Sequence, residues 1–311
     1  MPFFSVIIPT FNRRDNVRNA ILSVLDQSDK DFEIILIDDG SDDDTANIAD
    51  EFADKITYIF QENSGVVGAD LASANKITYL FQKNSGVSSA RNKGIVNSSS
   101  PHITFLDSDD IWRKNKLSRH REFIKSNPEI SIHQTEDIWI RNGVRVNPKF
   151  KHIKPQGQIF IQSLDLCLIS PSSVCISRSI FEKYGMFDEE LRACEDYDLW
   201  LRITPFEYIG LINEKLITRY AGHSDQLSSL YWGPDRFRLY SILKVLRTYG
   251  DRLPRDYINA AIDSAIKKAE ILLKGAIKRR NQKLEINLSQ LITQLRDGSY
   301  MQSDYRSLLE K

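Results

Sequence analysis

The sequence has few cysteines, no excess charge of either sign and no long apolar run. Its three cysteines, Cys167, Cys175 and Cys194, form no CxxC pair, which suits a reducing cytoplasm better than a disulfide framework. Lys+Arg and Asp+Glu both number 42, so the basic excess typical of phosphate-backbone binding is missing and we expect no nucleic-acid partner. No stretch approaches the roughly 18 apolar residues of a membrane-spanning helix.

Glycine and proline are also scarce, at 14 and 10 residues, which excludes a low-complexity chain. The 311 residues are 41% hydrophobic and 27% charged, as is ordinary for a globular protein. This length accommodates one large α/β domain, or a core domain with a helical appendage. We expect a cytoplasmic protein with a domain over residues 1–230 and a C-terminal helical region over 231–311.

Short apolar runs alternate with helical patterns over the first 110 residues. The runs Ser5–Ile8, Phe32–Ile37 and Ile103–Leu106 are continuous rather than alternating, which is typical of parallel strands covered on both faces. Apolar residues at helical spacing between Val17 and Leu25 predict a helix after the first run. The pattern predicts an α/β fold with a mostly parallel central sheet flanked by helices. Further along, we expect helices over 115–127, Ile180–Tyr184, Asp196–Ile203 and beyond Gly233, and strands over Ile130–Trp139 and Ser173–Ile176.

A tandem duplication interrupts this rhythm. Residues Lys55–Val66 recur as Lys76–Val87, with ten of twelve positions identical at an offset of 21. Two copies are too few for a solenoid, which needs about three repeats. We expect one copy to occupy the sheet and the surplus to form a surface excursion or an added edge strand. The sequence does not decide which copy does which.

Carboxylates gather where the predicted strands end. Asp38 and Asp39 follow the second run, and Asp107, Asp109 and Asp110 follow the third. Ligands of open α/β sheets bind at the carboxyl ends of strands, and carboxylate oxygens suit Mg²⁺ or Mn²⁺ shared with a substrate phosphate. The alternative is that these acidic residues form a turn or a helix cap.

Two other positions carry chemistry. Arg91 lies in the first turn of a predicted helix, where it would hold a phosphate or a nucleobase edge, or else be a solvated arginine on a capped helix. Glu195 and Asp196 begin another helix, where a carboxylate acts either as a general base or as a partner of the helix dipole. His223 is a lone loop histidine, a residue that is more often structural than a ligand.

Six blocks, taken together and in order, resemble the inverting glycosyltransferases of family 2, which have the GT-A fold. Any one block is common, but six in order over roughly residues 3–225 are specific. The blocks are Ser5–Asn12, Ile37–Ser41, Asn84–Asn92, Phe105–Asp110, Tyr184–Asp188 and Glu195–Arg202.

The resemblance implies a nucleotide site. Asp39 would hydrogen-bond the base, usually uracil in this family, and Arg91 would lie near the base or the diphosphate. Asp107, Ser108 and Asp109 match the family's D-x-D motif, with Asp109 as direct ligand of Mn²⁺ or Mg²⁺ and Asp107 nearer the ribose or a metal-bound water. The remaining residues that the resemblance assigns to nucleotide binding are Pro9, Thr10, Phe11, Asn12 and Asp38.

The resemblance also implies the catalytic groups. Asp196 matches the base that takes a proton from the acceptor hydroxyl, and Glu195 would orient the acceptor. His223 falls where relatives place a histidine that completes the metal or diphosphate site. The implied enzyme is a hexosyltransferase-type glycosyltransferase that moves a sugar from a nucleotide-diphosphate donor to a glycan or lipid-linked acceptor in cell-surface polysaccharide biosynthesis.

Two alternatives stay open. The first is a catalytically silent, nucleotide-binding relative with a role in assembly. The second is a nucleotidyltransferase, for which we would expect a glycine-rich loop after the first strand, whereas Pro9–Arg14 contains no glycine.

The C-terminal region has its own pattern. Basic residues dominate Ile266–Lys283, interspersed with isoleucines and leucines. Such a helix lies against an anionic membrane, forms a homodimer contact or simply has a solvated basic face.

Overall fold

The computed structural model describes residues 1–52, 56–59, 77–147, 152–222, 233–302 and 305–308. The chain forms two compact units. The helical region predicted from residue 231 onward falls in the second unit, which also takes two segments from within residues 1–230. The first unit comprises Met1–Gly157, Ile169–Glu189 and Glu207–His223, and the second comprises Gln158–Leu168, Glu190–Phe206 and Ser224–Lys311.

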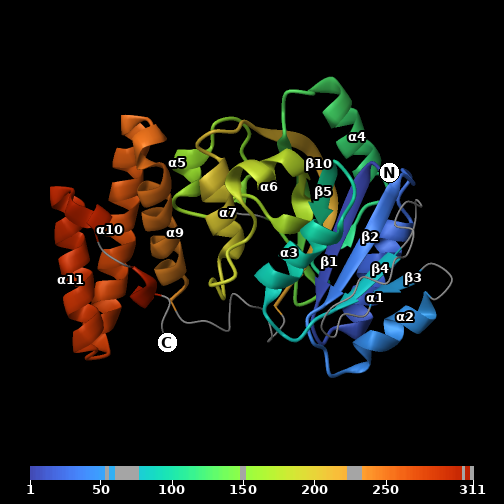
Figure 1. Cartoon of the computed structure of the whole chain (residues 1–311), viewed down its shortest axis with the longest axis horizontal. Helices are drawn as coiled ribbons and strands as arrows, with labels where there is room; N and C mark the ends of the chain where they lie inside the picture. Colours follow the sequence, from blue (N-terminus) through green and yellow to red (C-terminus); the bar gives the residue numbers. More distant parts are fainter. Residues whose placement is uncertain (53–55, 60–76, 148–151, 223–232, 303–304, 309–311) are drawn as a thin grey trace. The chain divides into compact units, whose positions relative to one another are not determined.

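The first unit is built on a ten-stranded mixed sheet with the strand order β3-β4-β2-β1-β5-β9-β7-β10-β6, and β8 pairs with β7 (Figure 1). The strands from β3 to β5 are parallel, whereas β9 is antiparallel to both of its neighbours. The strands are β1 (Phe4–Thr10), β2 (Phe32–Asp38), β3 (Ile56–Ile59), β4 (Ile77–Phe81), β5 (His102–Phe105), β6 (Ile111–Trp112), β7 (Ile132–Arg141), β8 (Val144–Val146), β9 (Val174–Ser177) and β10 (Ile209–Ala221).

The central strands have the character predicted for them. Every residue of β1 and of β2 is buried, so both faces of these strands are covered, as their continuous apolar runs require. On α1, the buried residues Val17, Ala20, Ile21 and Val24 form one helical face. The helices of this unit are α1 (Arg14–Leu25), α2 (Ile48–Glu51), α3 (Val87–Asn97), α4 (Lys116–Ser126) and α6 (Arg178–Tyr184).

Both copies of the duplication form strands of the sheet. The second copy, β4, pairs with β2, and the first copy, β3, pairs with β4 beyond it. Equivalent residues lie opposite one another, because Ile56 pairs with Ile77 and Tyr58 with Tyr79. The expectation of an added edge strand is therefore confirmed, and the second copy holds the inner position.

The second unit is helical in its described residues. Its core joins α7 to the C-terminal helices through buried side chains such as Leu201, Leu243, Leu272 and Leu288. None of the helices in the described part of the chain combines the length and the apolar composition that crossing a bilayer requires. The helices are α5 (Phe160–Ser163), α7 (Glu195–Ile203), α9 (Pro234–Tyr249), α10 (Arg255–Lys278) and α11 (Gln282–Asp297).

Candidate active site

The predicted nucleotide residues of the first unit cluster at the carboxyl ends of adjacent parallel strands. Thr10, at the end of β1, pairs with Asp38, at the end of β2, and the Asp39 N–H donates to the Thr10 carbonyl at 2.9 Å. On the other side of β1, the residue after β5, Leu106, donates its N–H to Ile7 at 2.9 Å. The segments that follow these strands therefore leave one edge of the sheet together, where α/β sheets bind their ligands.

The loop after β1 is fastened to the loop after β2. Asn12 has a left-handed backbone (φ 50°), and its N–H donates to the Ser41 hydroxyl at 2.9 Å. Its side chain exchanges two hydrogen bonds with Asp42, at 2.7 Å to the carboxylate and 2.9 Å from the backbone N–H. Between Asn12 and the strand, Phe11 is 45% exposed, whereas Pro9 and Thr10 are buried. Phe11 is thus the side chain of this loop that is open to a stacking ligand.

Asp38 and Asp39 hold the second copy of the duplication in place. Asp38 is fully buried and accepts hydrogen bonds from the Tyr79 hydroxyl at 2.7 Å and from the Ser41 N–H at 2.8 Å. Asp39 accepts three hydrogen bonds, all from residues of the second copy, and the last of these donors is the glycine that precedes α3. Their donors are Gln82 Nε2 at 2.7 Å, Ser85 N–H at 2.8 Å and Gly86 N–H at 2.8 Å. Asp39 therefore fixes the loop that leads into α3 while Asp38 holds β4, and contact with a nucleotide base stays a prediction.

The two outer carboxylates of the D-x-D motif each face an arginine. Arg91, on α3, places Nη2 2.8 Å from Asp107 Oδ1, and Arg13, after β1, places Nη1 2.6 Å from Asp109 Oδ2. The Arg91 side chain is only 4% exposed and its guanidinium lies 5.2 Å from the centre of the Phe187 ring. Ser108, the middle residue of the motif, is buried.

Behind the motif lies a buried charge network. Burial raises the pKa of Asp110 to about 8, the Arg219 guanidinium opposes this, and the neighbouring Asp107 and Asp109 add to it. Arg219 lies 3.7 Å from Asp110 and 3.8 Å from Asp137, which in turn lies 3.2 Å from the buried Lys154. This network, in which the partly exposed Arg219 joins the buried Asp110 and Asp137, fixes the backbone that presents the motif.

The donor chemistry of Asp107 and Asp109 fits a hard divalent cation. Carboxylate oxygens are the ligands that Mg²⁺ and Mn²⁺ prefer, and the two side chains are 26% and 16% exposed, so solvent reaches them. Each carboxylate already faces a guanidinium, so an incoming cation would compete with Arg13 and Arg91 for those oxygens. His223, the third predicted ligand, lies outside the described residues.

The predicted catalytic carboxylates lie in the second unit, at the start of α7. Asp196 is half-buried, and its Oδ1 accepts the Tyr197 N–H at 2.7 Å while its Oδ2 lies 3.4 Å from the Cys167 thiol. Glu195 is 7% exposed, and Cys194 before it has a left-handed backbone (φ 60°). The helix begins where the sequence predicted, and its first turn is acidic.

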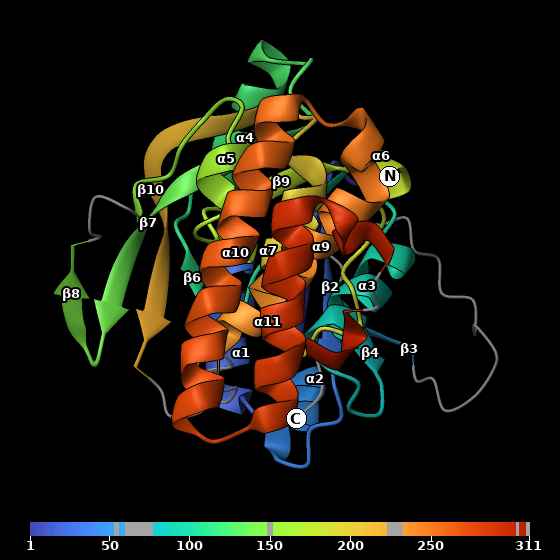
Figure 2. The same cartoon turned by 90° about the vertical axis from the view of Figure 1, so that its left-hand side faces the viewer.

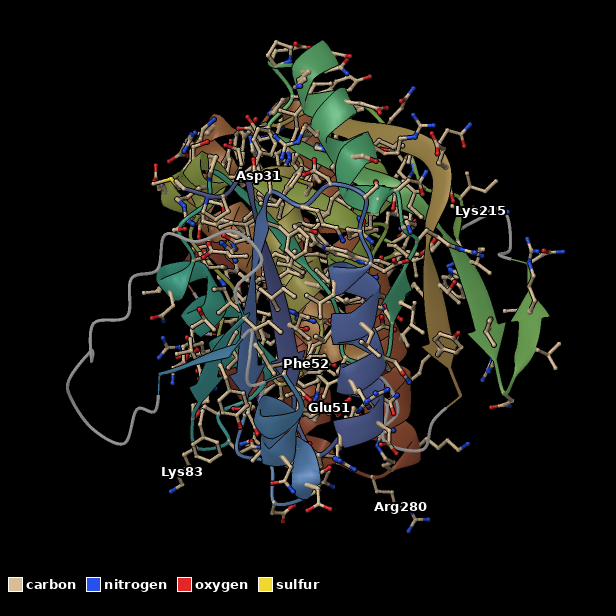
Figure 3. All side chains as sticks on the ribbon, turned by 90° about the vertical axis from the view of Figure 1, so that its right-hand side faces the viewer. Asp31, Glu51, Phe52, Lys83, Lys215 and Arg280 are labelled. Carbon is tan, nitrogen blue, oxygen red and sulfur yellow. The ribbon has the colours of Figure 1, made fainter. Side chains whose placement is uncertain are left out.

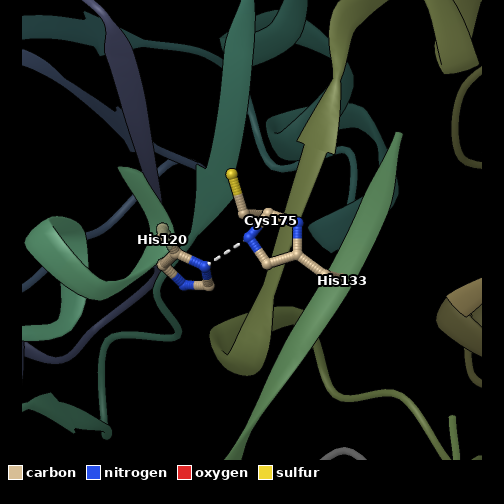
Figure 4. Close-up of side chains that lie close together, drawn as sticks. All are labelled: His120, His133 and Cys175. Carbon is tan, nitrogen blue, oxygen red and sulfur yellow. Dashed lines mark hydrogen bonds between the residues drawn. The ribbon is translucent and has the colours of Figure 1, made fainter. Parts of the chain in front are cut away.

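A second polar cluster, unforeseen from the sequence, lies within the first unit (Figure 4). His120 on α4 and His133 on β7 contact through Nδ1 and Nε2 at 2.8 Å, and Cys175 pairs with His133 across the sheet. The ligand atoms of these three residues lie within 4.8 Å of one another, and no other trio of His, Cys, Asp or Glu in the described residues is arranged to hold a metal.

This cluster is better explained as buried hydrogen bonding. Two nitrogens bound to one tetrahedral zinc at about 2.0–2.1 Å lie about 3.3 Å apart, which is farther than the 2.8 Å contact of His120 with His133. Lys116 Nζ also contacts His120 Nε2, at 2.5 Å, so both nitrogens of the His120 ring already have partners. Burial lowers the pKa of His133 to about 3, helped by Lys116 and His102, so that ring is neutral.

The structure brings the predicted nucleotide residues to one edge of the sheet, whereas sequence reasoning did not identify the side chains that contact them. It missed Arg13, Tyr79 and Gln82, which contact the predicted carboxylates from far along the chain. Arg13 is 96 residues from Asp109, and nothing in the local pattern indicates that pairing.

Known proteins resemble this chain in sequence. "Uncharacterized glycosyltransferase RP339" of Rickettsia prowazekii is 30% identical over 227 residues, which cover 70% of this chain and 63% of that protein. A Rickettsia felis protein named "Uncharacterized glycosyltransferase" is 34% identical over 68% of this chain and 32% of its own length, so this chain spans less than two thirds of either. "Putative teichuronic acid biosynthesis glycosyltransferase TuaG" of Bacillus subtilis is 29% identical over 74% of this chain and 83% of that protein.

Solved structures resemble it in fold. TarS residues 1–349 of S. aureus, in complex with UDP-GlcNAc, align over 97% of this chain and 94% of that chain with a TM-score of 0.61 and 17% identity. The mannosyltransferase PcManGT of Pyrobaculum calidifontis, in complex with GDP-Man and Mn²⁺, aligns over 99% and 86% with a TM-score of 0.56 and 14% identity. These likenesses concern the fold, which is the predicted GT-A type.

The family model described as "Glycosyl transferase family 2" matches residues 5–76 and 69–185. The two matches overlap within the duplicated stretch of residues 55–87, and together they cover more than half of the 311 residues. The chain therefore belongs to glycosyl transferase family 2.

Proposed function

We propose that this protein is an inverting glycosyltransferase. It moves a sugar from a nucleotide-diphosphate donor, with UDP as the expected nucleotide, to a hydroxyl of a glycan or lipid-linked acceptor in cell-surface polysaccharide biosynthesis. The observation that carries the proposal is the pair of carboxylate–arginine contacts, Asp107 with Arg91 and Asp109 with Arg13, at the strand ends of a family 2 fold. Carboxylates and guanidinium groups side by side suit a divalent cation and a diphosphate that bind together, and this supports the proposal.

The D-x-D carboxylates would act on the leaving group. Asp109, with Asp107 beside it, would hold Mg²⁺ or Mn²⁺, which offsets the negative charge that develops on the nucleotide diphosphate. Arg13 lies 2.6 Å from Asp109 and Arg91 lies 2.8 Å from Asp107. Once a bound cation replaces these contacts, the two guanidinium groups would donate hydrogen bonds to the phosphate oxygens instead. Fixed positive groups of this kind stabilise the departing anion without reorganising during the reaction.

Asp196 would act on the acceptor. A sugar hydroxyl is almost wholly protonated at neutral pH, and a positioned carboxylate that takes its proton during attack accelerates transfer by about 10²–10⁴-fold. Asp196 is half-buried, and the hydrogen bond from Tyr197 N–H at 2.7 Å fixes the direction of its carboxylate. Attack from the face opposite the leaving diphosphate inverts the sugar in one step. Glu195, buried beside it, would orient the acceptor.

The bound ligands of two similar structures and the name of one similar sequence support this assignment. TarS has been solved with UDP-GlcNAc and PcManGT with GDP-Man and Mn²⁺, while the name of TuaG places it in teichuronic acid biosynthesis. A nucleotide-sugar donor, a divalent cation and a cell-surface polymer are therefore the natural expectations for this chain. We also propose that it works in the cytoplasm.

The test is a thermal-shift panel of UDP, GDP, CDP and dTDP, each with and without Mn²⁺. A nucleotide present at 100 times its dissociation constant stabilises the folded state by about 2.7 kcal/mol. We expect a shift with one nucleotide, and only when Mn²⁺ is present, and we expect Asp109→Asn to abolish it. A Mn²⁺-independent shift that survives Asp109→Asn would contradict the metal-assisted mechanism, and the absence of any shift would contradict the nucleotide site.

A further inference from the structure

The C-terminal helices form an antiparallel hairpin whose turn is short and well defined (Figure 2). α10 ends at Lys278 and α11 begins at Gln282, so residues 279–281 connect them. Arg280 adopts a left-handed backbone (φ 56°), and the Asn281 side chain caps α11 by accepting the Leu284 N–H at 3.1 Å. In Figure 3 the Arg280 side chain projects outward from this turn.

Positive charge is concentrated on one stripe of this hairpin. Lys267, Lys274 and Lys278 recur at helical spacing on the exposed face of α10, and the charge continues through the turn. Between residues 264 and 283 the single acidic residue is Glu270, and Arg296 pairs with it at 3.0 Å. The exposed cations, which together define the basic hairpin, are Lys267, Lys274, Lys278, Arg279, Arg280 and Lys283.

Apolar side chains are exposed among these cations. Ile271 is 56%, Ile277 is 53% and Ile286 is 65% exposed, whereas the other face of each helix is packed into the core of the second unit. Ile271 lies on the same stripe as Lys267, Lys274 and Lys278, at positions i, i+4, i+7 and i+11. Cations interleaved with exposed isoleucines match the surface of a helix that lies in a membrane interface.

We propose that the basic hairpin docks this protein onto an anionic phospholipid bilayer. The lysine and arginine side chains would contact the headgroups while Ile271, Ile277 and Ile286 enter the boundary with the acyl chains. Nucleic acid also attracts cations, but its charged phosphate backbone would not bury the exposed isoleucines. A second copy of this chain is a poor occupant, because a two-fold interface would set the same cluster of cations against itself.

The proposal does not depend on the transferase activity proposed above. It requires only that the hairpin fold as described. If the proposed transferase activity holds, the bilayer surface is where that activity takes place. A protein held on a bilayer meets a lipid-linked acceptor in two dimensions rather than in the bulk solution.

The experiment is co-sedimentation of the full chain with vesicles of phosphatidylcholine alone or with one third phosphatidylglycerol. We expect binding to the anionic vesicles only. The variant Lys274→Gln/Lys278→Gln/Lys283→Gln should lower the partition coefficient by at least about tenfold, because each cation near an anionic surface contributes to binding. The variant Ile277→Ser/Ile286→Ser should also weaken binding, since it removes the apolar contact.

A control variant exchanges three exposed cations elsewhere, Lys30, Lys114 and Arg145, for Gln. It should bind like the unmodified protein. Failure of the unmodified protein to sediment, or equal binding by the control and the lysine variant, would overturn the proposal. Unchanged binding by the isoleucine variant would overturn the proposed entry of the isoleucines into the bilayer, because the contact would then be purely electrostatic. Nucleotide thermal shifts of all variants, run in parallel, separate this outcome from a failure of the proposed enzymatic site.

Discussion

Replacing the equivalent tyrosine in each copy of the duplication should lower the thermal stability by unequal amounts. The hydroxyl of Tyr79, in the second copy, donates to the fully buried Asp38 at 2.7 Å, so Tyr79→Phe leaves a buried carboxylate oxygen without this donor. A hydrogen bond to a carboxylate contributes about 1.5–3 kcal/mol. At about 2–4 °C per kcal/mol, the midpoint of thermal unfolding should fall by about 3–12 °C. Tyr58→Phe, the equivalent change in the first copy, should lower it by less, because β3 pairs with β4 and not with β2, the strand that ends at Asp38.

Deleting one repeat should move the first copy into the inner strand position that the second copy holds in the full chain. A variant without Val66–Gly86 joins the first copy directly to α3 and supplies every residue of the second copy from its equivalent. Two positions change: the buried Leu80 becomes isoleucine, and the exposed Lys83 (Figure 3) becomes glutamate. A volume-conserving apolar exchange costs less than about 1.5 kcal/mol, so the variant should fold and keep its nucleotide-dependent shift.

In that shortened background, Tyr58→Phe should become as costly as Tyr79→Phe is in the full chain. Differential scanning fluorimetry and circular dichroism melts of the five proteins complete the comparison. Equal effects of the two substitutions in the full chain would refute the assignment of the inner strand to the second copy. A shortened chain that is insoluble or melts without cooperativity would refute the view that the repeat is dispensable.

Three further outcomes follow from single side chains. Burial keeps His133 neutral in the folded protein, whereas an unfolded histidine binds a proton below about pH 6.5. Between pH 7 and 5 the free energy of unfolding, measured with urea, should therefore fall by about 2 kcal/mol more in this protein than in His133→Gln. An equal fall in both proteins would contradict the neutral ring. Gly94→Ala would place a Cβ 2.4 Å from an Ile7 methyl, and should destabilise α3 against β1 by about 1–3 kcal/mol; an unchanged melting midpoint would show that this contact relaxes. Arg13→Gln removes the guanidinium that faces Asp109, and should tighten binding of Mn²⁺ alone by about fivefold in an electron paramagnetic resonance titration, whereas weaker binding would assign Arg13 to the metal site.

The fold was predictable where the apolar pattern is continuous. β1, β2, β5 and α1 follow from their uninterrupted or helically spaced apolar residues. β10 was not foreseen, because its sequence mixes charged residues with apolar ones and its pairing with β7 shifts register between Ile212 and Ile217. A bulged strand does not maintain the alternation by which strands are recognised.

The site was predictable in its carboxylates but not in the groups that contact them. Asp107 and Asp109 stand in a recognisable motif after a strand, whereas Arg13 reaches Asp109 only because β1 and β5 are neighbours in the sheet. The duplication shows the same limit. Its two copies are nearly identical, and Tyr79 and Gln82, which contact Asp38 and Asp39, have identical equivalents in Tyr58 and Gln61, so no local pattern decides between the copies.

The most direct test of the account titrates the nucleotide identified in the thermal-shift panel, with Mn²⁺, into three proteins and follows turnover of its sugar conjugate in each. Asp109→Asn should lose Mn²⁺-dependent binding, because it removes the proposed ligand. Asp196→Asn should bind like the unmodified chain but turn over at least about 10²-fold more slowly, since only the base is lost. Full turnover by Asp196→Asn, or undiminished Mn²⁺-dependent binding by Asp109→Asn, would contradict the proposed division of metal and base between these two carboxylates.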